Sequence, residues 1–416
     1  MTSVPDGPIC VIGAGIAGAA AAFHLVEAGA REVVIVDAAG PLGGTTPAGA
    51  GFVARFGADH NRRLGGCTVP LQDYGLAFYR RLHEEGADLE FAHNGNVVLA
   101  LTTGELDRLA TGILGHPEVR DGTRRLGRDE VAEAMLGAVD PAAVAGGVLM
   151  PEAIQLTTAL AQRELLDRLD ATGVEFRWDT PVTRVKTTDG AVVGVETDDG
   201  MIEATTVVMA AGGWNAALLA SVDRRLPLVP MVATRFVSEA AGLSPQTPTV
   251  QCPELHLWLR ELHGAFSWGG SFAYRLVSAL SAEGLEFGYE RPVSQTLIDA
   301  QYAEQETIAE VFPALSGLPN VESIQGTPVY TVDGGLYIGE VPEIDGLWAL
   351  AGDSESGITH GPGMGKLVSQ LILGDEPFAN PAPFRLDRVD PAAYPDEAAL
   401  VAAMAEDRIA DAANRV

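Results

Sequence analysis

The chain has 416 residues, more than one hydrophobic core usually holds, so we expect two domains or one elaborated domain. Its hydrophobic fraction of 47% is ordinary for a globular protein. Its 56 acidic side chains against 27 basic ones give a formal charge of −29, which opposes binding to nucleic acid or to an anionic membrane surface and indicates a solvated acidic exterior.

The first elements have the strand, turn and helix pattern of a dinucleotide site. Residues 9–12 form a short β-branched run suited to a buried parallel strand. Gly13, Gly15 and Gly18 follow with G-x-G-x-x-G spacing where a helix over residues 16–28 begins. The first glycine would allow a tight turn, the second would let the backbone approach a pyrophosphate, and the third would let the helix lie close on the sheet.

An acid ends the second predicted strand, residues 31–36. Asp37 lies about 20 positions after Gly18, where it would accept hydrogen bonds from a ribose and disfavour a 2′-phosphate. The phosphates would bind free amides in the first helical turn, around Ile16 and Ala17. The pattern therefore favours FAD or NAD over NADP.

The low charge of residues 8–26 follows from this pattern. No basic segment precedes them, so we expect neither a signal peptide nor a membrane span. The three cysteines, Cys10, Cys67 and Cys252, are far apart and lack C-x-x-C spacing, so neither a metal site nor a disulfide framework is predicted. We expect a cytoplasmic protein.

The next stretch mixes loops, helices and strands. Residues 38–55 are too rich in small residues to form a packed element, so their backbone can run close to a ligand. We expect a helix over residues 68–85, a strand over 94–101, and short helices over 104–109 and from residue 126. This region is predicted to be an inserted α+β part.

A long helix and a series of strands follow. The helix covers residues 157–172, and the strands cover residues 174–178, 181–187, 191–197 and 201–204. A further buried strand over residues 206–209 runs into glycines, which places a second close backbone approach beside the first fingerprint. From residue 226 the pattern changes to strand-like pieces and a helix over residues 292–312, which indicates a second domain.

The C-terminal part returns to short apolar strands, within residues 326–339 and 347–353. A helix is expected to begin at residues 363–366 and to run to residue 373. Residues 395–416 are acidic and helical in pattern, and we give them no function.

Four stretches now stand in the order found in the D-amino-acid oxidase, glycine oxidase and sarcosine oxidase family of flavoproteins, which the chain resembles over nearly its whole length. These stretches are Gly13 to Gly18 with Asp37, the loop 45–55, the strand and turn 207–214, and residues 330–339 with 351–365. The resemblance implies an α/β fold in which a Rossmann-type FAD-binding domain is interleaved with a smaller, mixed-sheet α+β domain for substrate. The expected segments are 1–75, 146–225 and 322–380 for FAD, 76–145 and 226–321 for substrate, and 381–416 for a tail.

The resemblance also assigns cofactor contacts by position. The residues it adds to the fingerprint are Thr45, Thr46, Ala48 and Gly51 beside the phosphates or flavin, Val182 at the adenine, Ala211, Gly212 and Trp214 near the ribityl phosphate, and Gly352, Asp353, Gly357, Ile358 and Thr359 along the flavin. The start of the following helix, expected at residues 363–366, would stabilise negative charge at the flavin N1–C2=O locus.

Several positions depart from the family pattern. Pro328 stands where glycine oxidase-like members have an arginine for the substrate carboxylate. Thr359 replaces a lysine of sarcosine oxidase-like members, although Arg55 matches their arginine. Gly326 replaces the cysteine that tethers flavin, so we expect noncovalent FAD. Ser267 replaces the lysine that promotes reaction with oxygen, which leaves an oxidase and a dehydrogenase both open.

The resemblance implies oxidation of the C–N bond of a small amine or amino acid, with hydride passed to flavin N5, hydrolysis of the imine and reduction of oxygen to hydrogen peroxide. The candidate substrate residues are Arg55, Trp258, Arg260, Trp268 and Tyr330, because an arginine beside an aromatic wall suits a carboxylate. Arg260 could instead be a strand-surface residue, and the two tryptophans could serve ordinary packing. The absent arginine at position 328 favours an amine larger than glycine, N-substituted or with its carboxylate placed differently.

Two other functions remain open at this point. One is an amine dehydrogenase that passes electrons to a carrier, and the other is a non-catalytic flavin-binding subunit. An enzyme that uses NAD alone is disfavoured, because there is no second glycine fingerprint. The sequence leaves the amine, the electron acceptor and the oligomeric state undetermined.

Overall fold

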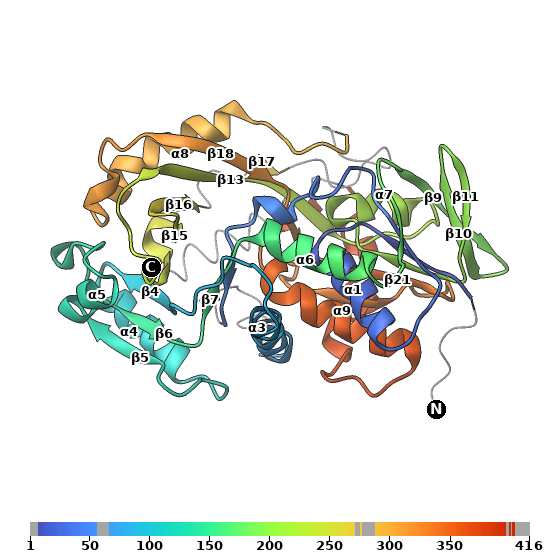
Figure 1. Cartoon of the computed structure of the whole chain (residues 1–416), viewed down its shortest axis with the longest axis horizontal. Coiled ribbons are helices and arrows are strands. Elements are labelled where there is room, and N and C mark those ends of the chain that lie inside the picture. Colours follow the sequence, from blue (N-terminus) through green and yellow to red (C-terminus); the bar gives the residue numbers. More distant parts are fainter. Residues whose placement is uncertain are drawn as a thin grey trace.

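The structure is a computed structural model that describes residues 7–55, 66–270, 275–276, 288–396, 399–400 and 402–403. Within these ranges two large sheets organise the chain, one of six strands and one of ten (Figure 1). Most of the acidic tail expected over residues 395–416 lies outside the described residues. The mixture of parallel and antiparallel strands confirms the predicted fold class.

The six-stranded sheet has the order β20-β21-β12-β1-β2-β8. Its members are β1 (Ile9–Ile12), β2 (Val33–Val36), β8 (Glu175–Arg177), β12 (Thr206–Met209), β20 (Tyr337–Glu340) and β21 (Leu347–Ala351). All pairs are parallel except β20 with β21. Every residue of β1, β2 and β12 is buried, which explains why these strands are continuous apolar runs rather than alternating ones.

Helices cover one face of this sheet, and a small antiparallel sheet covers the other. The helices are α1 (Ile16–Glu27), α3 (Val69–Glu84), α6 (Thr158–Asp170) and α9 (Gly357–Leu373). The small sheet consists of β9 (Val182–Thr188), β10 (Ala191–Thr197) and β11 (Gly200–Glu203), which pack with α7 (Asn215–Ala220). The carboxyl ends of β1 and β12 therefore lie together at one edge, as the two glycine-rich turns predicted.

The last helix, α9, begins at Gly357, so the predicted start at residues 363–366 is wrong. A Cβ on Gly365 would lie 2.5 Å from backbone atoms of α1, and one on Gly363 would lie 2.8 Å from the Cα of Leu71 in α3. The glycines therefore let α9 pack directly against α1 and α3. This burial outweighs the poor helix propensity of glycine and of Pro362, which misled the sequence prediction.

The ten-stranded sheet is built around the long strand β13 (Leu228–Ala240), which pairs with strands on both sides. The other members are β4 (Asn96–Ala100), β5 (Arg124–Gly127), β6 (Gly146–Met150), β14 (Thr249–Cys252), β15 (Leu257–Leu262), β16 (Ala265–Gly270), β17 (Arg275–Leu276), β18 (Asn320–Gly326) and β19 (Val329–Thr331). Helix α8 (Gln295–Ala309) covers one face in Figure 1, while α4 (Thr103–Leu114) and α5 (Arg128–Ala134) pack near β5 and β6. The β4–β14 pair is parallel and its neighbours are antiparallel, so the sheet is mixed.

The two sheets are connected by segments that alternate along the chain. Strands β6 and β18 belong to the ten-stranded sheet, whereas α3 packs on α9 beside the parallel sheet. A short two-stranded sheet, β3 (Phe52–Val53) with β7 (Ile154–Gln155), joins the loop after β2 to the start of α6. The interleaved layout places that loop between the two large sheets.

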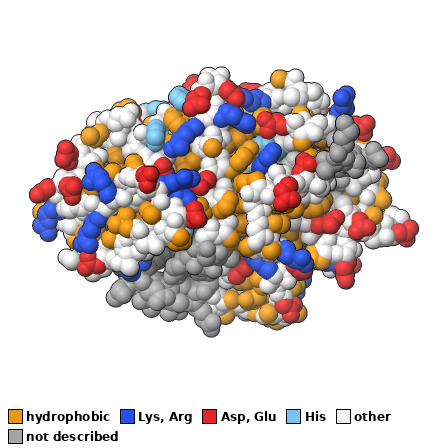
Figure 2. Space-filling model, turned by 90° about the horizontal axis from the view of Figure 1, so that it is seen from below, with side chains coloured by type: hydrophobic (Ala, Val, Ile, Leu, Met, Phe, Trp, Pro, Cys, Tyr) orange, Lys and Arg blue, Asp and Glu red, His pale blue; other side chains and the backbone are white. Residues whose placement is uncertain are grey.

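The exterior carries charges of both signs. On the face shown in Figure 2, acidic and basic side chains are interspersed. Arg168, for example, pairs with Glu85 and Glu164 at 2.5 and 2.7 Å. Exposed pairs of this kind contribute little stability each, so the large acidic excess is mainly a solvated exterior. Within the described part of the chain, no helix has both the length and the hydrophobicity needed to cross a membrane.

Gly365→Ala tests the close packing of α9 on α1. The new Cβ would press against backbone atoms of Ala20 and Ala21, so we expect a loss of about 1–3 kcal/mol in the free energy of unfolding. Urea denaturation followed by circular dichroism measures this loss. Gly112→Ala in α4 is the matched control, because among the described residues a Cβ there meets nothing within 4 Å beyond its own helix, and it should be neutral or stabilising. Equal stability of Gly365→Ala and the wild type would contradict the packing argument.

Candidate functional site

The first glycines permit two close backbone approaches. Gly13 has a φ of +100°, and a Cβ on it would lie 2.5 Å from the carbonyl oxygen of Ala210, just beyond β12. A Cβ on Gly18 would lie 1.9 Å from the carbonyl oxygen of Gly13. Larger residues are therefore excluded at both positions, as the fingerprint predicts. The turn after β12, which carries Ala211, Gly212 and Trp214, lies directly beside the first turn.

The start of α1 offers free hydrogen-bond donors. Within the described residues, the backbone amides of Gly15, Ala17 and Gly18 have no hydrogen-bond partner, whereas the amide of Ile16 donates to the Thr46 hydroxyl at 3.0 Å. That hydroxyl also lies 3.4 Å from a Cβ built on Gly15. Free amides at a helix start, with a positive dipole end, form a site for a phosphate group.

Asp37 lies at the end of β2 and closes the same turn. Its carboxylate accepts hydrogen bonds from the amides of Ala14 at 2.7 Å and Ala39 at 2.9 Å. Burial raises the pKa of Asp37, while these two bonds oppose that effect. The amide of Thr180 donates to the Asp37 carbonyl at 2.9 Å, so the segment that leads to Val182 lies next to this acid. The geometry fits the predicted ribose and adenine end of a dinucleotide.

The loop over residues 45–52, here called the bridging loop, contacts both large sheets. The Thr45 hydroxyl accepts the amide of Thr327 at 3.1 Å, and the carbonyl of Phe52 accepts the hydroxyl of Thr359 at 3.2 Å. A Cβ on Gly326 would lie 2.8 Å from the Cβ of Ala48. A glycine at position 326 is therefore required for the bridging loop to lie this close to β18.

A second turn meets the bridging loop from the C-terminal side. Gly352 has a φ of +79°, and a Cβ on it would lie 2.4 Å from the Cγ2 of Thr331. Asp353 follows, and its carboxylate accepts backbone hydrogen bonds from Val329 and Glu355. Burial raises the pKa of Asp353 to about 6.

Helix α9 begins within this turn, and the backbone amides of Gly357 and Ile358 have no partner among the described residues. Because Thr359 bonds Phe52, the positive end of α9 lies against the bridging loop. The helix start that we expected near residue 363 is thus supplied at Gly357.

Arg260 in β15 is buried and not a strand-surface residue, since only 3% of it is exposed. Its Nη1 donates to the Leu156 carbonyl at 2.8 Å, and a Cβ on Gly51 would lie 3.1 Å from the same nitrogen. The side chain therefore faces the bridging loop. Burial lowers the pKa of Arg260 to about 10, and the positive charge of Arg235 adds to this effect.

Arg235 in β13 is a second buried arginine on this face, and it was missed in the sequence analysis. Its Nε donates to the Ala48 carbonyl at 3.1 Å, and its Nη1 donates to the Ser267 hydroxyl at 3.0 Å. It is 7% exposed, and burial lowers its pKa to about 10. The available signal was a single arginine in the otherwise apolar and small-residue run of residues 229–238.

The predicted aromatic residues do not all share this face. Trp258 is half-buried beside Phe52 in the bridging loop, with ring centroids 6.2 Å apart. Trp268 points to the opposite face, where it is fully buried under α8 and donates its Nε1 hydrogen to Asn320 at 3.2 Å. Tyr330 is half-buried and packs against a small cluster that includes Met231.

Arg55, the other predicted arginine, is fully buried at the end of the stretch that follows β3. Its Nε lies 2.9 Å from a carboxylate oxygen of Asp73, which also pairs with Arg120 at 2.7 Å. Burial lowers the pKa of Arg55, and Asp73 opposes that effect. Its charge is therefore already balanced within the protein.

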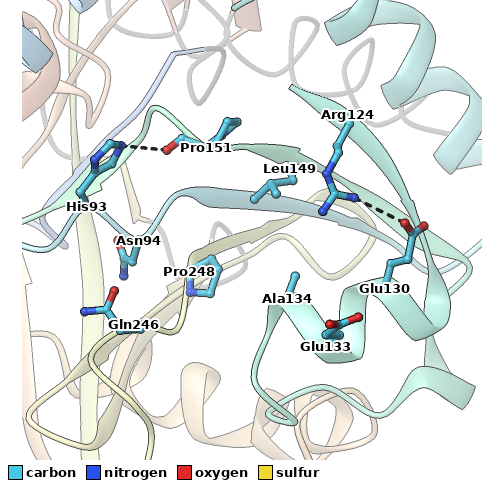
Figure 3. Close-up of a pocket in the computed structure, with 10 residues that line it drawn as sticks. All are labelled: His93, Asn94, Arg124, Glu130, Glu133, Ala134, Leu149, Pro151, Gln246 and Pro248. Carbon is cyan, nitrogen blue, oxygen red and sulfur yellow. Dashed lines mark hydrogen bonds and ion pairs between the residues drawn. The ribbon is translucent and has the colours of Figure 1, made fainter. Parts of the chain in front are cut away.

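A cavity of about 440 Å³ lies elsewhere, between α5, the end of β6 and the loop around Gln246 (Figure 3). Arg124 and Glu130 face each other across its rim at 3.5 Å, and His93 bonds the Pro151 carbonyl at 3.0 Å. None of the predicted site residues lines it. We therefore place the candidate site at the bridging loop and not in this cavity.

Comparisons with known proteins add a family and several relatives. The family described as DAO, FAD dependent oxidoreductase, matches residues 8–371. The 4-methylaminobutanoate oxidase (formaldehyde-forming) of Paenarthrobacter nicotinovorans is 29% identical over 378 residues, which are 88% of this chain and 44% of that protein. The mitochondrial dimethylglycine dehydrogenase of Rattus norvegicus is 25% identical over 404 residues, which are 92% of this chain and 44% of that protein. The chain thus spans less than half the length of these two relatives.

A solved structure superposes on most of the chain. The crystal structure of glycine oxidase from Geobacillus kaustophilus superposes with a TM-score of 0.79 and 25% sequence identity. The match covers 92% of this chain and 99% of that chain.

Asp353→Asn tests the environment at the start of α9. The pKa of Asp353 is raised to about 6, above the ordinary value of about 4, so the folded chain binds this proton more tightly than the unfolded chain does. The ionised carboxylate therefore costs stability, a cost that grows from about pH 4 to pH 6 and is complete above it. We expect Asp353→Asn to gain on the order of 1–3 kcal/mol relative to wild type between pH 4 and pH 7, measured by urea denaturation. A difference that does not change with pH would refute the raised pKa.

Proposed function

The chain belongs to the DAO family of FAD-dependent oxidoreductases, and from this membership we propose that it oxidises the C–N bond of a small amine or amino acid, including N-substituted amino acids. The predicted family and its dependence on FAD are confirmed by the match over residues 8–371. The observation that carries the proposal is that three features lie at the bridging loop. They are the start of α1, the glycines that allow close backbone approaches, and the buried Arg260.

The residues present fit FAD. The unpaired amides of Gly15, Ala17 and Gly18 would hold the pyrophosphate, and Asp37 would accept the ribose hydroxyls. The bridging loop and the start of α9 would follow the flavin. We propose noncovalent binding, because the approach of Ala48 leaves no room for a side chain at Gly326.

When bound, FAD supplies a two-electron acceptor that takes hydride at flavin N5 from the carbon beside the substrate nitrogen, after which the imine is hydrolysed. The protein's own part is positioning. Arg260 would bind the substrate carboxylate, since its guanidinium is buried and forms no ion pair within the described residues. Trp258 and Phe52 would line the substrate site beside Arg260. Arg55 is a weaker anchor, because Asp73 already balances it.

The acceptor of the electrons is a separate part of the proposal. We favour oxygen, reduced to hydrogen peroxide, over an electron carrier. The two curated relatives are named as an oxidase and a dehydrogenase, so both alternatives retain support. A non-catalytic flavin-binding subunit is the third alternative, although the buried arginines would then lack a ligand.

Purified protein should carry a yellow flavin that denaturation releases. We expect anaerobic addition of N-substituted amino acids to bleach it, because the site holds a carboxylate beside the reacting carbon. Stopped-flow absorption in the flavin band measures the rate, and free glycine is the control that should react more slowly.

The outcomes separate the alternatives. Rapid reoxidation in air indicates an oxidase, and slow reoxidation indicates a dehydrogenase. Bound flavin that no amine bleaches would indicate a binding subunit, and a colourless protein that takes up no FAD would overturn the proposal.

Arg260→Met should raise the apparent Kd of a carboxylated substrate at least tenfold, because a charge-assisted, bidentate contact would be lost. Arg55→Met should raise it less, since Arg55 pairs with Asp73. The concentration dependence of anaerobic bleaching gives both values. Arg125→Met is the matched control, because Arg125 pairs with Asp107 at the far edge of the same sheet. A larger effect at Arg55 than at Arg260 would reverse the assignment.

A further inference from the structure

Two arginines lie buried on one face of the ten-stranded sheet without a carboxylate partner. Arg235 and Arg260 are 7% and 3% exposed, and neither forms an ion pair within the described part of the chain. The Nε of Arg260 is buried with no hydrogen-bond partner, and the Nη2 of Arg235 also has none among the described residues. Each guanidinium therefore keeps a donor available for a ligand.

The register of the sheet places the two arginines on either side of Ser267. Arg260 stands opposite Ser267 in the neighbouring strand β16, and Arg235 on the other side of β16 donates to the same Ser267 hydroxyl at 3.0 Å. Two strand spacings, about 10 Å, separate β15 from β13. Long arginine side chains from both strands can therefore reach one small ligand between them. Their contacts at Ala48 and Leu156 place that ligand at the bridging loop.

The nearest acids are committed elsewhere. Glu261 accepts from Gln155 at 3.3 Å and from the Gly264 amide at 2.7 Å. Glu90 accepts from Thr157 at 2.5 Å and from His263 at 2.9 Å. Glu322 attracts Arg235 only from a distance that forms no ion pair, and the positive charge of Arg291 opposes it. Glu261 and Glu90 attract Arg260 without forming an ion pair with it among the described residues, so two like charges are held close together with no carboxylate in contact.

Such an arrangement is costly unless an anion enters it. A buried, unpaired charge costs several kcal/mol, and the positive charge of Arg235 lowers the pKa of Arg260 further, so repulsion adds to burial. One carboxylate would balance one guanidinium and leave the second unpaired. A ligand with two carboxylates would balance both, with a charge-assisted hydrogen bond available at each.

We propose that the substrate is a small amine with two carboxylate groups, one bound by Arg260 and the other by Arg235. This inference rests on the proposed function and narrows its substrate class. The second carboxylate stands either on the nitrogen substituent or on the side chain of the amino acid. Arg235 is then a specificity-determining residue, whereas Arg260 binds the carboxylate that every substrate of this enzyme shares.

Binding of inert anions tests the inference without turnover. Diglycolate carries two carboxylates and methoxyacetate carries one, and neither has a nitrogen to oxidise. We expect diglycolate to perturb the flavin absorption spectrum of the holoenzyme with a Kd at least tenfold below that of methoxyacetate, the effect of one added charged contact. Equal affinity for the two anions would overturn the proposal.

Variants at Arg235 test whether this residue causes the difference in Kd between diglycolate and methoxyacetate. Arg235→Met should bring the two Kd values within about twofold of each other and leave methoxyacetate binding nearly unchanged, while Arg235→Lys should restore part of the preference. Arg125→Met, which removes a surface charge from the same sheet, should keep the full preference. A preference that survives in Arg235→Met would also overturn the proposal. If that variant does not fold, the wild-type comparison and Arg235→Lys remain decisive.

Substrate reduction separates this inference from the proposed function. Iminodiacetate and aspartate carry the second carboxylate on the nitrogen substituent and on the side chain, and sarcosine and alanine are their monocarboxylate controls. We expect at least one dicarboxylate to bleach the flavin at least tenfold more efficiently than its control. If the monocarboxylates react equally well, the inference fails and the proposed function stands. If no amine reacts, the proposed function fails, while anion binding still reports on the two arginines.

Discussion

The close approach of the bridging loop to both large sheets is the constraint on which the site depends. The loop contacts the start of α1 through Thr46, β18 across Gly326 and the start of α9 through Phe52. The path of the loop requires glycine at two positions, because a Cβ at Gly326 or Gly51 would overlap with its neighbours. The bridging loop is thus held in one path. Along this path lie the phosphate site at α1, the start of α9 and the two buried arginines.

Charge is distributed in an unusual way around this space. The chain carries a formal charge of −29, yet the described face of the ten-stranded sheet that meets the bridging loop holds two buried arginines without acids. A negative exterior slows the approach of an anion, so the affinity for an anionic ligand must come from short contacts inside. Interactions at low dielectric are strong enough for this, because salt and water screen them little.

Sequence patterns predicted the elements that depend on local chemistry. The fingerprint from Gly13 to Gly18 and the strand β10 follow from glycine spacing and apolar runs, and the structure places both where they were expected. The start of α9 could not be predicted in this way, because packing on α1 overrides the low propensity of its glycines. The faces of Trp268 and Arg235 depend on the register of β13 and β16, which is a long-range property that local patterns do not contain.

The early start of α9 determines where the positive end of its helix dipole lies in the candidate site. A helix beginning near residue 363 would direct its positive end toward Leu71 in α3, whereas the observed start at Gly357 directs it toward Phe52. The start of α9, whose Gly357 and Ile358 amides have no partner among the described residues, then lies at Phe52 of the bridging loop, and the guanidinium of Arg235 contacts the same loop at Ala48. Both would stabilise negative charge that develops on a group held along this loop, and neither contribution requires a general acid. The fold therefore supplies the electrostatics, while the two arginines determine which anion enters.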